Sequence, residues 1–141
     1  MSRAIEDLEP DTRAKCVALL QACSNAGFPL LVVATYRSFE EQEALYAKGR
    51  SRPGPMVTHA RAGDSWHNYR RAFDVCFLLS DGKISWTGPW SDVAEIGRSI
   101  GLTWGGDWQA GKQDRPHFEY HPGMSLEEAK AKAYIPKVIQ A

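Results

Sequence analysis

The centre of the predicted fold is residues 65–79, SWHNYRRAFDVCFLL. From residue 72 onward the sequence alternates and then becomes wholly apolar, which is typical of a strand in the middle of a sheet. His67 ends the polar loop that leads into this strand, and Asp74 lies on the strand itself. Burying a carboxylate without a partner costs several kcal/mol, and a divalent metal is one partner that removes this cost. We therefore expect Asp74 to face a positively charged group.

The segments around this strand mix helices with short strands. Ser38 and Glu41 have the spacing of a capping box, which opens a helix, and Asp81-Gly82 is typical of a hairpin turn. Residues 49–64 are rich in Gly, Pro, Arg and Ser and are expected to form a long functional loop. The pattern predicts helices at 11–26, 38–49, 91–100 and 125–133, and strands at 29–36, 72–79, 84–86, 102–104 and 116–120. The predicted class is α+β, a small antiparallel sheet flanked by helices.

Length and charge limit the classes of function. The chain has 141 residues, which fits one domain. Its 17 acidic and 17 basic residues give a formal net charge of zero, so bulk electrostatics does not favour nucleic acid as a partner. No window is long and apolar enough to cross a bilayer, so we expect no membrane insertion. The first residues carry acids and lack an apolar run, which predicts that there is no signal peptide.

The cysteines are predicted to be reduced and buried. There are 3 of them, without the density or spacing of a disulfide scaffold. Cys16 and Cys23 share the first predicted helix, where a rise of about 1.5 Å per residue places them roughly 10 Å apart. That separation is beyond the reach of a disulfide.

A second histidine lies in DRPHFE, residues 114–119. His117 is on a predicted strand, and Asp114 lies three residues before it. Two histidines and a carboxylate suit zinc, and catalytic zinc takes three protein ligands and leaves its fourth position to water. A free carboxylate beside that water can take its proton and later give it to a leaving amine. Asp114 is the candidate for this base, and Glu119, on the same strand face as His117, is the alternative.

The whole pattern resembles one family of zinc peptidases. Ser-x-His followed by Ala-x-Asp, and Asp-x-x-His after Trp-Gly-Gly-Asp-Trp, are similar to the D-alanyl-D-alanine carboxypeptidase and L-alanyl-D-glutamate endopeptidase family. The likeness extends from about residue 31 to residue 120 and is greatest to small bacteriophage endolysins. The resemblance implies a Hedgehog/DD-peptidase-like fold. It also implies that His67, Asp74 and His117 hold Zn²⁺ and that Asp114 is the general base.

The resemblance also suggests residues that face the substrate. Arg37 resembles the family arginine that faces the scissile carbonyl, and a fixed guanidinium can stabilise an oxyanion. A surface ion pair with a neighbouring glutamate, Glu40 or Glu41, is the alternative for Arg37. Three further candidates for substrate binding are Ser65, Trp108 and His59.

Two further positions lie close to the predicted ligands in the sequence: Arg70, between the first two, and His121, after the third. Relatives commonly have glycine where this chain has Arg70, so the loop has to turn there without a residue that accepts positive φ cheaply. His121 precedes a proline and is predicted to be a surface turn residue, with no part in the site.

The predicted function is cleavage of the L-alanyl-D-glutamate bond of bacterial peptidoglycan by a phage endolysin that lyses its host. We expect residues 1–141 to form a single catalytic domain, without a separate wall-binding domain, and to act as a monomer. We expect synthesis in the host cytoplasm and action on the wall after release through a permeabilised membrane. One alternative is a D-alanyl-D-alanine carboxypeptidase. Another is a non-catalytic wall-binding module whose zinc is closed by a fourth ligand, Cys76 or His121.

Overall fold

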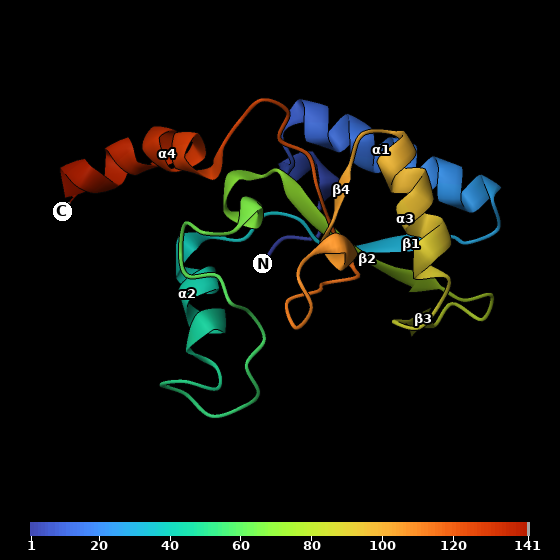
Figure 1. The fold of residues 1–141 in the computed structure, drawn as a ribbon, viewed down its shortest axis with the longest axis horizontal. Coiled ribbons are helices and arrows are strands. Elements are labelled where there is room, and N and C mark those ends of the chain that lie inside the picture. The colour runs from blue at the N-terminus through green and yellow to red at the C-terminus, as the bar shows by residue number, and fades with distance from the viewer. Residues whose placement is uncertain (141) are drawn as a thin grey trace.

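An antiparallel sheet lies at the centre of the structure, a computed structural model that describes residues 1–140 (Figure 1). Within the described residues the sheet has five strands in the order β1-β2-β5-β4, and β3 pairs with the far end of β2. The strands are β1 (Leu30–Ala34), β2 (Ala72–Leu78), β3 (Ile84–Ser85), β4 (Thr103–Trp104) and β5 (His117–Glu119). Strand β2 therefore pairs with three neighbours, as the apolar run of residues 72–79 predicts.

Helices flank this sheet, which confirms the α+β prediction. Figure 1 shows α1 and α3 beside each other, while α2 lies on the other side of the molecule. The α-helices are α1 (Pro10–Asn25), α2 (Phe39–Ala47), α3 (Trp90–Ser99) and α4 (Leu126–Gln140), and the short 3-10 turns are η1 (Ile5–Asp7), η2 (Trp66–Tyr69) and η3 (Gly105–Asp107). The predicted element ends lie within two residues of the observed ones, except that α4 extends to Gln140 instead of residue 133.

The hydrophobic core fills the space between the sheet and the α1–α3 pair. Phe73 of β2 and Phe118 of β5 are fully buried there and stack with ring centroids 5.9 Å apart. Strand alternation then turns the neighbours of these residues to the other face of the sheet. The register pairs Asp74 with His117 directly across β2 and β5, so a carboxylate and an imidazole lie together opposite the core.

The capping box and the state of the cysteines agree with the predictions from the sequence. The Ser38 hydroxyl accepts a hydrogen bond from the Glu41 amide, and the Glu41 carboxylate accepts one from the Ser38 amide, which completes the capping box of α2. The three cysteines are buried and free, as predicted. No helix among the described residues combines the length and the apolar character that a membrane crossing requires.

Candidate metal centre and cleft

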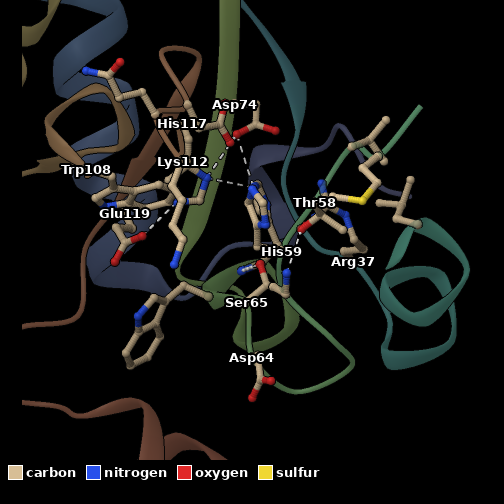
Figure 2. A pocket seen from close by; sticks show the side chains of 18 of the residues that line it. Arg37, Thr58, His59, Asp64, Ser65, Asp74, Trp108, Lys112, His117 and Glu119 are labelled. Carbon is tan, nitrogen blue, oxygen red and sulfur yellow. Dashed lines mark hydrogen bonds and ion pairs between the residues drawn. The ribbon is translucent and has the colours of Figure 1, made fainter. Parts of the chain in front are cut away.

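Three predicted metal ligands converge on one point. His67 comes from η2, Asp74 from β2 and His117 from β5, and their ligand atoms all lie within 4.8 Å of one another. Nε2 of His67 is 3.2 Å from Oδ1 of Asp74, and Nδ1 of His117 is 3.3 Å from the same oxygen. The two histidine nitrogens are 3.2 Å apart. Figure 2 shows the Asp74 and His117 side chains directed toward the same position.

Backbone structure positions these side chains. Asp74 and His117 are partners in the sheet register. His67 lies in η2. The Ser65 hydroxyl accepts a hydrogen bond from the His67 amide, and the Asn68 side chain accepts one from the Ser65 amide, which completes a capping box. The same Asn68 donates to the Arg37 carbonyl oxygen, so the turn is tied to the segment after β1.

The donor atoms fit a divalent cation. A backbone carbonyl can only accept a hydrogen bond, so the contact of 2.8 Å with the Thr35 oxygen places a proton on Nδ1 of His67. Nε2 of His67 is then free to bind a metal. On His117 the nitrogen facing Asp74 is Nδ1, because Nε2 contacts Glu119 at 2.8 Å. A proton on Nδ1 of His117 can occupy the space between the three groups, and a divalent cation can replace that proton.

The charges around this point favour a cation. Burial alone raises the pKa of Asp74, but the two imidazoles outweigh burial and hold that pKa well below its usual range. Burial alone lowers the pKa of His117, but hydrogen bonds to Asp74 and Glu119 outweigh it and raise the pKa to about 10. Burial likewise raises the pKa of Glu119, and hydrogen bonds from His117 and His121 bring it down to about 2. Two ionised carboxylates therefore contact the imidazoles.

The predicted general base, Asp114, lies beside the cluster and is not one of its three members. Its amide donates to the Gly105 carbonyl oxygen at 3.0 Å, and its own carbonyl oxygen accepts the His117 amide at 3.2 Å. Burial and the charge of Asp74 raise the pKa of Asp114, against the opposing effect of nearby His117, His67 and Arg37. A carboxylate with a raised pKa is better suited to accept and release protons near neutral pH than an exposed one.

Arg37 faces the same cleft. Its amide donates to the His67 carbonyl oxygen at 3.0 Å, and its Nη1 donates to Gln42 at 2.9 Å. Its Nε is buried and has no hydrogen-bond partner within the described part of the chain. Glu41, the alternative partner from sequence, instead caps α2 and pairs with the N-terminal amine. The guanidinium lies in the lining of the cleft, where the charges of Asp74 and Asp114 act on it.

The cleft around these groups has a volume of about 1010 Å³. Residues 56–60 of the long loop form one wall, and residues 111–114 form part of the other. All three predicted substrate contacts line it: Ser65, Trp108 and His59. The Trp108 ring lies 4.9 Å from the His117 ring, and His59 is exposed on the loop (Figure 2). Ser65 has a structural task in addition, because its hydroxyl caps η2.

Arg70 adopts the conformation that its place in the motif requires. Its φ of 63° and ψ of 31° are left-handed, and it is the one residue other than glycine with positive φ among those described. Its guanidinium lies 4.0 Å from the Tyr36 ring centre and donates to the Asp7 carbonyl oxygen at 3.0 Å. These contacts offset part of the cost of a left-handed residue with a side chain.

The prediction for His121 is right about the turn, because its carbonyl oxygen accepts a hydrogen bond from the Met124 amide at 3.1 Å, but wrong about the surface position. His121 is half-buried, stacks on Trp66 with ring centroids 3.9 Å apart, and hydrogen-bonds Glu119. Strand alternation from His117 through Glu119 carries these side chains on one face, a signal in the sequence that points to His121 as well. Neither His121 nor Cys76 belongs to the metal-ligand group found among residues 1–140. A fourth protein ligand of the kind that closes structural zinc sites is therefore not part of that group.

Comparisons with known proteins identify relatives of this chain. A family model described as D-alanyl-D-alanine carboxypeptidase matches residues 58–120. The chain is 39% identical over 126 residues to the peptidoglycan L-alanyl-D-glutamate endopeptidase CwlK of Bacillus subtilis, covering 82% of this chain and 75% of that protein. It is 30% identical over 123 residues to an L-alanyl-D-glutamate peptidase of a Listeria phage, covering 83% of this chain but only 39% of the phage protein.

The fold is also similar to that of solved structures. The Serratia marcescens L-alanyl-D-glutamate endopeptidase ChiX superposes with a TM-score of 0.59 at 22% identity, covering 83% of each chain. At this identity the likeness establishes the shared fold.

Proposed function

This chain belongs to the D-alanyl-D-alanine carboxypeptidase and L-alanyl-D-glutamate endopeptidase family of metallopeptidases, and we propose that it is a zinc-dependent endopeptidase of peptidoglycan. The proposed bond is the one between L-alanine and D-glutamate in the stem peptide. The observation that carries the proposal is the convergence of His67, Asp74 and His117 beside a separate acid in a chain related to CwlK over most of both lengths.

In this proposal His67, Asp74 and His117 hold the zinc ion. Two imidazoles and one carboxylate form a donor set that zinc commonly takes in hydrolytic enzymes. When bound, zinc lowers the pKa of water and polarises a carbonyl group. Asp114 takes a proton from the attacking water at its carboxylate and returns it to the leaving amine. The raised pKa of Asp114 supports this role.

The other cleft residues position the substrate. Arg37 donates to the oxygen of the scissile carbonyl as negative charge develops there, and its place in the lining of the cleft, near Asp74 and Asp114, supports that assignment. Trp108, beside the His117 ring, offers an apolar surface for the stem peptide. Ser65 and His59 are proposed as polar contacts, one from the start of η2 and one from the long loop.

The test is digestion of purified peptidoglycan, with and without a chelator, followed by mass spectrometry of the fragments. We expect muramyl fragments that keep only L-alanine, together with peptides that begin at D-glutamate. The chelator should abolish cleavage and added zinc should restore it. Asp114→Asn should stay folded and bind zinc but lose at least about 10²-fold in rate. The exposed Glu95, on α3, supplies a control, because Glu95→Gln should cleave at the rate of the unmodified protein.

A second candidate is removal of the terminal D-alanine, which the description of the matching family model favours. It uses the same zinc site on a different bond. Loss of D-alanine alone in the digest would establish this candidate and exclude the endopeptidase. Intact stem peptides from several types of wall would contradict both and support the wall-binding module.

We also propose a role as an endolysin, which the similarity to a phage peptidase supports. The single catalytic domain at residues 1–141 and the monomeric state are parts of the same proposal. Such a protein would be made in the host cytoplasm and would reach the wall once the membrane is permeabilised. Expression in a bacterium with and without a membrane-permeabilising protein tests this role. Lysis only when both are present would support it, and growth without lysis in both cultures would contradict it.

A further inference from the structure

A chain of side chains extends from Nε2 of His117, the ring nitrogen that does not face Asp74, and its first member, Glu119, also lines the cleft. Nε2 of His117 contacts Oε1 of Glu119 at 2.8 Å, and the second oxygen of Glu119 hydrogen-bonds Nε2 of His121. Glu119 is only 6% exposed. The His121 ring stacks on Trp66, with an angle of 6° between the ring planes. Trp66 directly precedes His67, so the chain starts at one proposed ligand and ends next to another.

The position of Glu119 argues against its use as the general base. It binds the Nε2 edge of His117, whereas the nitrogen near Asp74 and His67 is Nδ1. Both oxygens of Glu119 already accept hydrogen bonds from histidines. A base needs an oxygen within hydrogen-bond reach of the water from which it takes a proton. Glu119 lines the cleft, but one of its oxygens is engaged by Nε2 of His117 and the other by His121.

This position suits control of the ligand itself. A neutral imidazole that donates from Nε2 to a carboxylate has its lone pair on Nδ1, so once a metal displaces the second proton it binds at Nδ1. Carboxylates that accept from ligating histidines fix the ring orientation and raise the basicity of the metal-binding nitrogen. Each oxygen of Glu119 is held by a different ring, so the carboxylate itself has little freedom to turn.

The outer end of the chain is anchored as well. Trp66 meets Tyr69 edge to face at 6.0 Å, and the Tyr69 hydroxyl donates to the Gly63 carbonyl oxygen at 2.7 Å. His121 therefore stacks on a ring whose own position is set by η2 and the end of the long loop. Because η2 also carries His67, a movement of His67 would strain the contacts that hold His117, and a movement of His117 would strain those that hold His67.

We infer that Glu119, held by His121 against Trp66, is a positioning residue that selects Nδ1 of His117 as the zinc ligand and sets zinc affinity. The inference deepens the proposed function and rests on its metal site. It assigns Glu119 no direct contact with the substrate.

The test measures zinc affinity of the whole chain without substrate, by competition with a chromophoric chelator. Glu119→Leu keeps the approximate volume but removes the acceptor, and zinc affinity should fall about 10- to 100-fold. Glu119→Gln keeps one acceptor for His117 and should lose less than the leucine variant. His121→Ala should fall between the unmodified protein and Glu119→Leu. Glu95→Leu, an exposed glutamate changed in the same way, should bind zinc as the unmodified protein does.

Two further measurements separate positioning from catalysis. The visible spectrum of bound Co²⁺ should change in Glu119→Leu, because the spectrum reports the arrangement of the ligands. Turnover of Glu119→Gln should recover when zinc is saturating. Unchanged zinc affinity with turnover lost at saturating zinc would overturn the inference and make Glu119 the base.

Folding is checked by circular dichroism without metal. If Glu119→Leu does not fold, the zinc affinities of Glu119→Gln and His121→Ala provide the test. The inference is overturned if both variants bind zinc as tightly as the unmodified protein does. The readout is also independent of the reaction. A chain that binds zinc in a Glu119-dependent way but leaves peptidoglycan intact would contradict the proposed function and leave this inference standing.

Discussion

Gly105 is the position where one added methyl group should damage the site most directly. A Cβ built there would lie 2.3 Å from the carbonyl oxygen of Asp114 and 3.0 Å from Cβ of His117. Ordinary contacts begin at 3.4 Å, so the backbone in Gly105→Ala has to separate by about 1.1 Å. The φ of Gly105 lies outside the left-handed region, so the expected damage is steric and not conformational.

The size of the effect follows from that displacement. Moving a reacting group by about 1 Å can cost roughly 10²-fold in rate, and overpacking typically costs about 1–3 kcal/mol of stability. We therefore expect Gly105→Ala to lose about 100-fold in kcat/KM on a purified stem-peptide substrate at saturating zinc. Unfolding by denaturant measures the stability loss on the same samples.

Gly82→Ala is the matched control. Gly82 has a φ of 84° and open space around its position, in the turn before β3 and away from the cleft. Alanine there should cost about 1 kcal/mol through backbone strain and leave kcat/KM unchanged. The reasoning fails if Gly105→Ala keeps the rate of the unmodified protein, or if both variants lose rate equally.

Other changes test separate parts of the structure. Arg37→Lys should lower kcat about 10²- to 10³-fold with zinc content unchanged, because one ammonium cannot replace the fixed guanidinium; lost zinc would show instead that Arg37 supports the metal site. Arg70→Ala should be about 1 kcal/mol less stable than Arg70→Gly by denaturant unfolding, since only alanine keeps a Cβ in the left-handed region; equal stabilities would contradict this. Phe118→Ala should lose about 3–5 kcal/mol, measured in the same way, and a loss below 1 kcal/mol would mean that the core collapses around the gap. Zinc at about a thousand times its Kd should stabilise the chain by about 4 kcal/mol over the chelated form, and equal melting temperatures would argue against a site in the folded state.

The strand at residues 72–78 and the convergence of the three metal ligands could be anticipated from the sequence. Alternation places Asp74 and Phe73 on opposite faces, and a histidine motif on a second short strand gives Asp74 a partner. What remained open was the register. A slip of one residue between β2 and β5 would turn His117 into the core, and only the observed pairing of Asp74 with His117 excludes it.

The role of Glu119 could not be derived in the same way. Sequence places it on the face of His117, which is equally compatible with a base and with a support for the ligand. The difference depends on which imidazole nitrogen it contacts, and that depends on the rotation of a ring, which no residue pattern specifies. The sequence predicts the turn at His121 but not the packing of its ring, because the stacking partner, Trp66, is far from it in the chain.

The short strand β5 joins stability to chemistry. His117 and Glu119 face the site, whereas Phe118 between them is fully buried against Phe73 and lies so close to α3 that a Cβ at Gly97 would come within 2.7 Å of its ring. The packing of one side chain therefore limits how far the strand can rotate, and the same rotation would move both polar neighbours. Because close-packed cores resist such movement, the hydrophobic contacts of Phe118 help to hold His117 and Glu119 at the separation their hydrogen bond requires.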